Sequence, residues 1–237
     1  MREAPRNEER PEFDAYAREY AELIRDPIRE KFATDNRYFF ERKAHVIRSF
    51  YKNIGIDTRT LRWLDVGCGQ GDLMRLLSPF FGAAAGCDPS GEMLQASRDL
   101  DVRPQPVADK VPFGDASFDL VTAVCVYHHV PCSERPALTR EILRVLRPGG
   151  IFAMIEHNPV NPATRMIVSR TPVDAHAKLL RASESRQLMA SAGARHMSTR
   201  YFLYVPEGLH KYLGFIEDGL AWFPLGGQYS VFGNAVK

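Results

Sequence analysis

Three glycines and an acidic residue form the first group in this chain whose types and spacing could do chemistry. The glycines stand at alternate positions, Gly67, Gly69 and Gly71, and Asp65 precedes them at the end of a short apolar run. Glycine permits positive φ and a close approach of the backbone to a ligand, and the helix expected behind the turn presents unpaired N–H groups. A carboxylate would repel a pyrophosphate but would pair with an amino group. The pattern therefore predicts a binding turn for a polar ligand that carries a cation.

A second acid, Asp88, ends the next apolar run, Ala83 to Asp88. In nucleotide-binding folds an acid about 20 residues past the glycines, at the end of the second strand, accepts hydrogen bonds from the ribose hydroxyls. Asp88 is therefore a candidate ribose ligand. Capping of the helix that follows is the alternative, because a cap and a ligand look alike in sequence.

Histidines follow two later apolar runs. His128 and His129 come after the run at 118–126, and His157 comes after the run at 151–156. Open α/β sheets bind their ligands beyond the carboxyl ends of the strands, so these side chains fall where a substrate would lie. A histidine titrates near neutral pH and could take a proton from a hydroxyl or amine. The three are candidate catalytic bases, with holding of the loop or contact with a cofactor as the alternative.

Apolar strands that alternate with helices must position these residues. This alternation predicts an α/β fold with a doubly wound, mainly parallel sheet. Helices are expected at 13–24 and 39–54, before the glycine turn, and again after each of the early strands. The expected strands are 61–66, 83–88, a weaker third near 103–108, 118–126, 151–156, 198–205 and 226–236.

Residues 61–156 resemble the class I S-adenosylmethionine-dependent methyltransferases. The resemblance rests on the acid and alternating glycines, on Asp88, on the strand that begins Phe118-Asp119 and on the Leu-Arg-Pro-Gly-Gly turn at 146–150. It implies a seven-stranded Rossmann-like sheet with an antiparallel last strand, and S-adenosyl-L-methionine as the cofactor. It also implies that the glycine turn faces the methionine part of the cofactor and that Asp88 holds its ribose.

The resemblance adds further candidate cofactor residues. Cys68 lies within the turn and Pro89 directly follows Asp88. Asp109 would contact the adenine, although it lies closer to Val111-Pro112-Phe113 than the acid of relatives does, and a solvent-facing turn residue is an equal alternative. Tyr16 and Tyr20 would close over the ligand from the first helix, or would simply pack that helix onto the sheet.

We expect one methyltransferase domain over residues 1–237. Within it, an N-terminal helical cap (1–55) precedes the cofactor-binding core (61–156), and a substrate-facing insertion (157–182) follows. A helical insertion at 206–225 carries a one-sided apolar stripe. That stripe could cap a hydrophobic substrate, form a dimer contact or rest on a membrane surface, with packing on the core as the alternative.

Composition excludes several classes of protein. The 237 residues are 45% hydrophobic and 25% charged, as in ordinary globular proteins. A net charge of +2 without a basic run argues against nucleic acid as a partner. No apolar run is long enough to span a bilayer and the N-terminus is polar, so we expect a cytoplasmic protein. The four cysteines lack zinc-type spacing, and we expect buried thiols without a metal or disulfide.

These features predict transfer of a methyl group from S-adenosylmethionine to an oxygen, nitrogen or carbon nucleophile of a small or lipid-like metabolite. Methyl transfer from a sulfonium is an in-line displacement, so the protein aligns the reactants and excludes water, and we expect no metal. One alternative is a nicotinamide-dependent oxidoreductase, which the glycine spacing disfavours. Another is a non-catalytic protein that binds a cofactor or a partner on the same fold.

Overall fold

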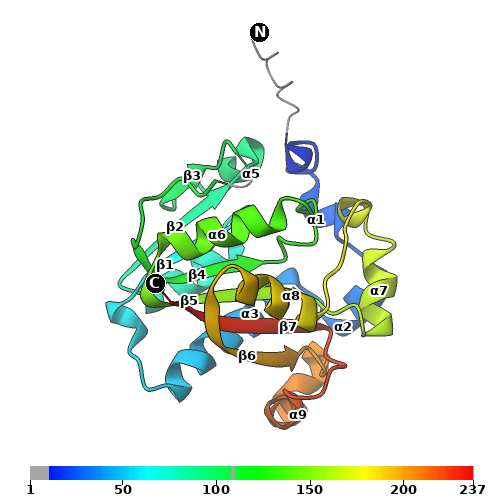
Figure 1. Cartoon of the computed structure of the whole chain (residues 1–237). Helices are drawn as coiled ribbons and strands as arrows, with labels where there is room; N and C mark the ends of the chain where they lie inside the picture. Colours follow the sequence, from blue (N-terminus) through cyan, green and yellow to red (C-terminus); the bar gives the residue numbers. More distant parts are fainter. Residues whose placement is uncertain (1–10, 108–109, 237) are drawn as a thin grey trace.

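Within residues 11–107 and 110–236, which the computed structural model describes, seven strands form one sheet in the order β3-β2-β1-β4-β5-β7-β6 (Figure 1). β7 is antiparallel to both of its neighbours, and the remaining pairs are parallel. The predicted seven-stranded, mainly parallel sheet with an antiparallel last strand is thereby confirmed. The strands are β1 (Arg62–Val66), β2 (Ala83–Asp88), β3 (Val102–Pro104), β4 (Phe118–Val124), β5 (Leu146–His157), β6 (Ala194–Phe202) and β7 (Gln228–Ala235).

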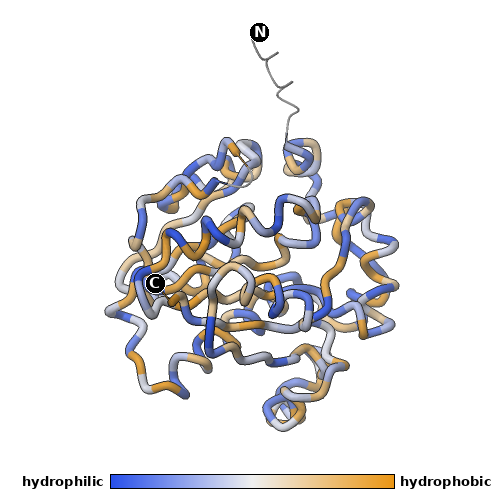
Figure 2. Tube along the Cα trace, in the orientation of Figure 1, coloured by the Kyte–Doolittle hydropathy of each residue, from blue (hydrophilic) through white to orange (hydrophobic). Residues whose placement is uncertain are grey.

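Helices cover both faces of the sheet because alternate strand residues point to opposite sides. In β1, Trp63 packs with the helices α3 (Asn36–Asn53) and α4 (Asp72–Leu77), whereas Leu64 packs in the cluster of α6 (Arg135–Val145) and α8 (Ala182–Ser191). Figure 2 shows the hydrophobic residues concentrated in these central strands. The sheet is therefore packed between two apolar layers. A ligand would then bind beyond the carboxyl ends of the strands.

The N-terminal cap differs from the helix predicted at 13–24. The chain there forms a 3-10 turn, η1 (Glu12–Asp14), then irregular turns and the short α1 (Tyr20–Leu23). The reason is tertiary: Asp14 accepts hydrogen bonds from Ser90 Oγ and from the Glu92 N–H, and the Ala17 carbonyl accepts one from Gln70. These contacts hold residues 12–24, which we call the strap, across the glycine turn.

A further helix, α2 (Pro27–Phe32), was not predicted although its start signal is present. Asp26 accepts hydrogen bonds from the Ile28 and Arg29 N–H groups, and Pro27 occupies the first helical position. The predicted second helix is confirmed as α3, which begins after the cap Asp35. The cap region therefore presents α2 and α3 toward the glycine turn.

The segment 157–182 is more ordered than a loop. It contains α7 (Pro162–Val168) and the 3-10 turn η4 (Pro172–Asp174). Asn161 accepts a hydrogen bond from the Thr164 N–H and thereby caps α7, in which Pro162 is the first residue. The remaining short helix near the glycine turn is α5 (Gly91–Gln95).

The helical insertion is present as α9 (Glu207–Leu220), but its apolar stripe does not pack on the core. Tyr212 and Phe215 are exposed to 68% and 75%, and Trp222, just beyond the helix, is also exposed to 75%. The buried residue of α9 is Glu217, which accepts hydrogen bonds from the Tyr204 and Val205 N–H groups. The helix is therefore anchored by an acid and turns its apolar side outward.

Two smaller expectations also need correction or restriction. Cys68 and Cys87 are buried free thiols as expected, but Cys125 is half-buried and Cys132 is exposed. Asp109 lies outside the described residues. Among the described helices, none combines the length and the apolar character that crossing a membrane requires.

Candidate active site

A cavity of about 440 Å³ opens at the carboxyl ends of β1, β2, β4 and β5. Its walls come from the glycine turn, the strap, α2, α3 and α7, so the N-terminal cap and the 157–182 segment face each other across it. Most of the predicted site residues line it, namely Asp65, Gly67, Cys68, Gly69, Asp88, Pro89, Tyr20, His128, His129 and His157.

Two predicted cofactor residues do not line the cavity. Gly71 has a φ of +81°, and a Cβ there would lie 2.6 Å from Leu100 Cδ1, so this glycine serves the start of α4 and its packing. Tyr16 packs edge-on against Phe13 in the strap. Tyr20 does line the cavity, and burial raises the pKa of its hydroxyl, which therefore stays protonated.

The glycine turn is held by hydrogen bonds to the next strand. The Gly67 and Cys68 N–H groups donate to the Cys87 carbonyl, at 2.8 and 3.0 Å. Gly67 has a φ of +72°, and a Cβ there would come within 2.4 Å of Val126 Cγ2. The glycine is therefore required by both the backbone conformation and the contact with Val126.

Asp88 connects β2 to this turn. One carboxylate oxygen accepts the Gly69 N–H at 2.9 Å, and the other accepts the Ser90 N–H at 2.8 Å. The N-cap of α5 is Ser90, whose hydroxyl accepts the Met93 N–H, so the capping role suggested for Asp88 belongs to its neighbour. Burial raises the pKa of Asp88, and these two donors oppose the rise. The Asp88 carboxylate thus lines the cavity, and a backbone N–H group on each of its two oxygens fixes its position.

Asp65 is 3% exposed at the end of β1 and accepts a 2.6 Å hydrogen bond from Thr122 Oγ1. The Trp63 indole N–H in turn donates to that hydroxyl. Burial raises the pKa of Asp65 to about 7, while Thr122 and the ammonium of Lys43 oppose the rise. A cationic group bound beside it would favour the ionised form.

Lys43 is a cavity residue that was not predicted. It lies on α3, is 6% exposed, and holds its Nζ 4.6 Å from the centroid of the Phe40 ring. The sequence did contain a signal, because Lys43 falls on the apolar stripe of this helix, where a lysine is unusual. Its ammonium faces the same space as Asp65.

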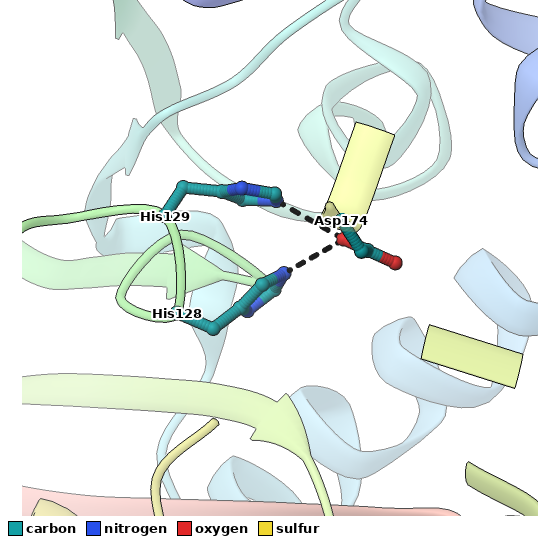
Figure 3. A group of neighbouring side chains, drawn as sticks. All are labelled: His128, His129 and Asp174. Carbon is teal, nitrogen blue, oxygen red and sulfur yellow. Dashed lines mark ion pairs between the residues drawn. The ribbon is translucent and has the colours of Figure 1, made fainter. Parts of the chain in front are cut away.

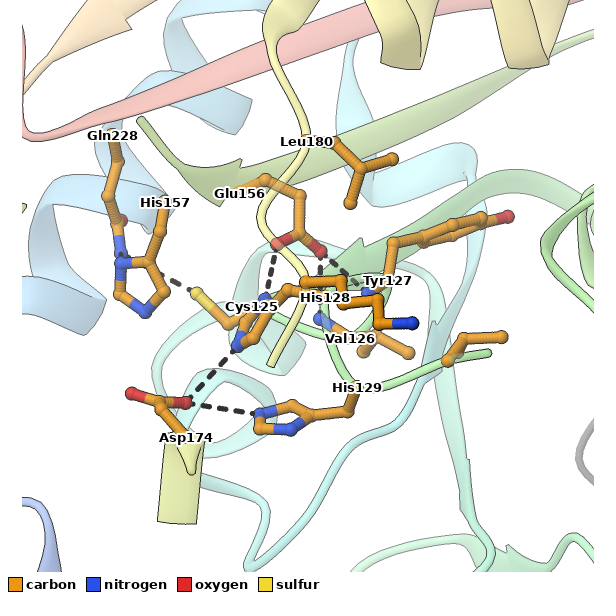
Figure 4. Close-up of polar contacts among 12 residues, drawn as sticks. Cys125, Val126, Tyr127, His128, His129, Glu156, His157, Asp174, Leu180 and Gln228 are labelled. Atoms are coloured by element: carbon orange, nitrogen blue, oxygen red, sulfur yellow. Dashed lines mark hydrogen bonds and ion pairs between the residues drawn. The ribbon is translucent and has the colours of Figure 1, made fainter. Parts of the chain in front are cut away.

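Beyond β4, two histidines and two acids form a continuous network, which we call the histidine–acid network: His128, His129, Glu156 and Asp174 (Figures 3 and 4). His128 Nδ1 lies 2.5 Å from Glu156 Oε2, and its Nε2 lies 3.5 Å from Asp174 Oδ1. His129 Nε2 lies 3.4 Å from the same Asp174 oxygen. Asp174 comes from η4, in the segment predicted to face the substrate.

The two histidines have opposite electrostatic environments. Burial disfavours the charge on His128, but Glu156 and Asp174 outweigh it and raise the pKa of this imidazole to about 10. For His129, burial and then the neighbouring His128 charge lower the pKa to about 3. At neutral pH His128 is therefore an imidazolium held between two carboxylates, and His129 is neutral.

A second polar group occupies the floor of the cavity. Gln228 Nε2 lies 3.5 Å from Cys125 Sγ and 3.4 Å from His157 Nδ1, as Figure 4 shows for this corner of the site. Burial would raise the pKa of the Cys125 thiol, but Lys43 and His157 reverse this and lower it to about 6. His157 is thus placed beside Cys125, and its ring centroid lies 5.1 Å from that of His128, so it adjoins the histidine–acid network.

Several site residues could not be found from local patterns. Glu156 ends an apolar strand and Asp174 lies in a segment of many charged residues, so neither stood out from its neighbours. Arg29 lines the cavity from α2, and Gln228 begins the last strand. The sheet order, which places β5 next to β4 and β7 next to β5, brings Glu156 and Gln228 to this end of the sheet. Arg29 and Asp174 reach the same cavity from α2 and η4.

Comparison with known proteins agrees with this geometry. Residues 64–154 match the protein family described as "Methyltransferase domain". Methyltransferase GfsG of Streptomyces halstedii is 29% identical over 177 residues, which cover 64% of this chain and 62% of that protein. The ubiquinone biosynthesis O-methyltransferase of Xanthomonas oryzae pv. oryzae is 28% identical over 74% of this chain and 66% of its own length. In both comparisons the match spans less than two thirds of the relative.

A solved structure shares the fold over nearly the whole chain. It is a SAM-dependent methyltransferase of Thermotoga maritima, described as a possible histamine N-methyltransferase, with a TM-score of 0.68 at 18% identity and coverage of 94% of this chain and 98% of that chain. At this identity the likeness concerns the fold alone. The family match shows a methyltransferase domain over residues 64–154. The glycine turn, the sheet order and the relatives together support a class I S-adenosylmethionine-dependent methyltransferase.

Proposed function

We propose that this protein transfers a methyl group from S-adenosylmethionine to an oxygen, nitrogen or carbon nucleophile of a small or lipid-like metabolite. The observation that carries the proposal is that the glycine turn with its two acids and the histidine–acid network line one cavity. A cofactor site and a proton-accepting site thereby share a single space. That arrangement is what transfer between two bound molecules requires.

The residues around the glycine turn suit the cofactor. Asp88 is placed to accept the ribose hydroxyls, and Asp65 is placed to pair with the amino group of the methionine part. The ammonium of Lys43, on the facing helix, suits the methionine carboxylate. When bound, the cofactor supplies an electrophilic methyl on its sulfonium. The strap that Asp14 joins to Ser90 covers this end of the cavity and limits the access of water.

The histidine–acid network suits an acceptor that loses a proton during the transfer. His129 is neutral and half-buried at the cavity wall, and Asp174 beside its Nε2 favours the tautomer with the proton there. Its other ring nitrogen can then accept a hydrogen bond from a substrate hydroxyl or amine. Because the pKa of this imidazole is low in the free protein, it takes the full proton only where negative charge on the bound acceptor raises that pKa. His128 is already protonated, so we assign it a positioning role. Its Nδ1 pairs with Glu156 and its Nε2 with Asp174, and it thereby holds Asp174 in place. His157 is proposed as a contact to the acceptor.

The walls of the cavity favour a partly apolar acceptor. Residues such as Ile28, Phe32, Phe39 and Ile167 line it together with the polar groups described above. Relatives carry names that refer to small molecules, among them a 2-methyl-6-phytyl-1,4-hydroquinone methyltransferase of Synechocystis and a 27-O-demethylrifamycin SV methyltransferase of Amycolatopsis mediterranei. With a net charge of +2 and no basic run, a nucleic-acid acceptor is disfavoured.

Calorimetry with S-adenosylmethionine, S-adenosylhomocysteine and the nicotinamide cofactors tests the cofactor. Incubation of a whole-cell extract with the protein and methyl-labelled cofactor, followed by separation of small molecules from macromolecules, tests the transfer. We expect binding of the first two ligands and label in a small-molecule fraction. Binding of a nicotinamide cofactor alone would overturn the proposal in favour of an oxidoreductase. Cofactor binding without label in any fraction would favour a non-catalytic binding protein, and label in RNA would exclude the metabolite acceptor.

A further inference from the structure

Two cations of the N-terminal cap, Arg29 and Lys43, line the cavity without a carboxylate partner among the described residues. The guanidinium of Arg29 donates to Asn36 Oδ1 and lies 4.5 Å from the centroid of the Phe39 ring. The Lys43 ammonium lies over the Phe40 ring. Neither side chain forms an ion pair with any residue in 11–107 or 110–236. The Cys125 thiol, whose pKa is lowered to about 6, is a negative group that acts on both cations. A buried cation that lacks a direct ion pair is costly, so each of them is suited to a further anion that enters with a ligand.

The two cations serve different ends of the cavity. Lys43 lies close enough to Asp65 to oppose the rise of its pKa that burial causes, which places the ammonium at the glycine turn. Arg29 lies on α2, whose N-cap Asp26 is 4.0 Å from Arg170, just before the turn η4 that carries Asp174. Burial lowers the pKa of Arg29, and the groups that oppose this fall are Tyr20, Cys125, Asp174 and Asp26. Arg29 therefore faces the side of the histidine–acid network, where we expect the acceptor to bind.

The charges of the cofactor do not account for both cations. S-adenosylmethionine carries one carboxylate, and Lys43, next to Asp65 and the glycine turn, is placed to receive it. Arg29 is then left with Asn36 as its hydrogen-bond partner and the Phe39 ring beside it. A carboxylate on the second molecule in the cavity would supply a direct ion pair for this guanidinium.

We propose that the acceptor is an amphipathic carboxylic acid whose carboxylate binds to Arg29 while its apolar part lies against the cavity wall. A guanidinium presents two parallel N–H donors that match the two oxygens of a carboxylate. The wall beside Arg29 is apolar, with Ile28, Phe32 and Ile167 in the lining. A single cation in such surroundings suits a monoanion, whereas the dianion of a phosphate monoester would need a further positive charge. This inference rests on the proposed methyl transfer, since it names the substrate class of the same site.

The test uses the full chain saturated with S-adenosylhomocysteine and two probes of equal length, octanoate and octanamide. Binding is measured by calorimetry and by the shift of the unfolding temperature. We expect octanoate to bind roughly 10-fold or more tightly than octanamide, as a charge-assisted hydrogen bond implies. In Arg29→Gln this preference should vanish, and in Arg29→Lys it should be reduced, because a lysine keeps the charge but lacks the paired donors.

Arg25→Gln is the matched control, because Arg25 precedes the same helix but pairs with Glu30 in solvent. It should keep the preference for octanoate. An equal or undetectable response to the two probes, or a preference that survives in Arg29→Gln, would overturn the inference. Tighter binding of octyl phosphate than of octanoate would replace the carboxylate by a phosphate and would also overturn it. Binding of S-adenosylhomocysteine, measured first on each sample, separates these outcomes from a failure of the proposed function.

Discussion

His128 Nδ1 lies 2.5 Å from Glu156 Oε2, and both side chains are almost completely removed from solvent. The other Glu156 oxygen accepts the Val126 and Tyr127 N–H groups, at 2.9 and 2.7 Å. One carboxylate from β5 therefore fixes both the imidazolium and the backbone of the loop after β4. This pair supports the position of the whole histidine–acid network.

Replacement of Glu156 by glutamine should destabilise the protein in a pH-dependent way. Near pH 6 we expect a loss of about 3–5 kcal/mol in the free energy of unfolding, because a buried charge loses its partner. The pKa of His128 is raised from 6.5 to about 10, so its contribution is fully present below 6.5 and is lost as the pH rises through about 10. The pKa of Glu156 is lowered by His128 against the effect of burial, so its contribution is lost as the pH falls below its ordinary value.

Urea unfolding of both proteins at pH 6, 8 and 10 measures this difference. The gap between wild type and Glu156→Gln should narrow steadily from pH 6 to pH 10. Glu41→Gln, which alters an exposed pair with Arg37, provides the control and should show no such trend. A gap that stays constant with pH would refute the assigned protonation of His128.

Replacement of His129 by alanine should lower turnover by roughly 10²–10⁴-fold with little change in cofactor affinity, because a proton acceptor acts in the transition state. His176→Ala is the control, since His176 is an exposed histidine of the 157–182 segment, two residues after Asp174. Turnover is followed with labelled cofactor and affinity by calorimetry. A loss of cofactor binding equal to the loss of turnover would show that His129 contacts the cofactor instead.

Replacement of Asp88 by alanine should leave the protein folded but weaken cofactor binding by roughly 10- to 100-fold, because hydrogen bonds to a charged acceptor are lost. The exposed Asp101, at the entry to β3, offers Asp101→Ala as a matched control. Calorimetry with S-adenosylhomocysteine and circular dichroism report on the two properties. Unchanged affinity in folded Asp88→Ala would remove Asp88 from the cofactor site.

Replacement of Lys43 by methionine should weaken binding of S-adenosylhomocysteine by roughly 10-fold or more but should leave binding of 5′-methylthioadenosine unchanged. The second ligand lacks the amino acid part, so it cannot report the loss of a carboxylate partner. Lys52→Met, on the exposed side of the same helix, serves as the control. An equal loss for both ligands would place Lys43 elsewhere in the cavity.

The sequence alone determined the core of the fold and the place of the glycine turn and its two acids at the carboxyl ends of the strands. The strand at 83–88 has the bounds that its apolar run predicts, and Asp65, Gly67 and Asp88 lie together at the sheet edge as expected. These features depend on contacts between near neighbours in the chain. Hydrophobic periodicity, turn glycines and strand ends record such contacts directly.

Only the tertiary structure decided how the histidines divide their roles. His128 and His129 are adjacent in sequence and equivalent by type, yet carboxylates from β5 and η4 make one a buried cation and leave the other neutral. Likewise, contacts with α5 and the glycine turn convert the predicted first helix into a strap. Charge state and burial depend on residues that are distant in sequence. Local patterns do not contain that information, because it arises only when the folded chain brings those residues together.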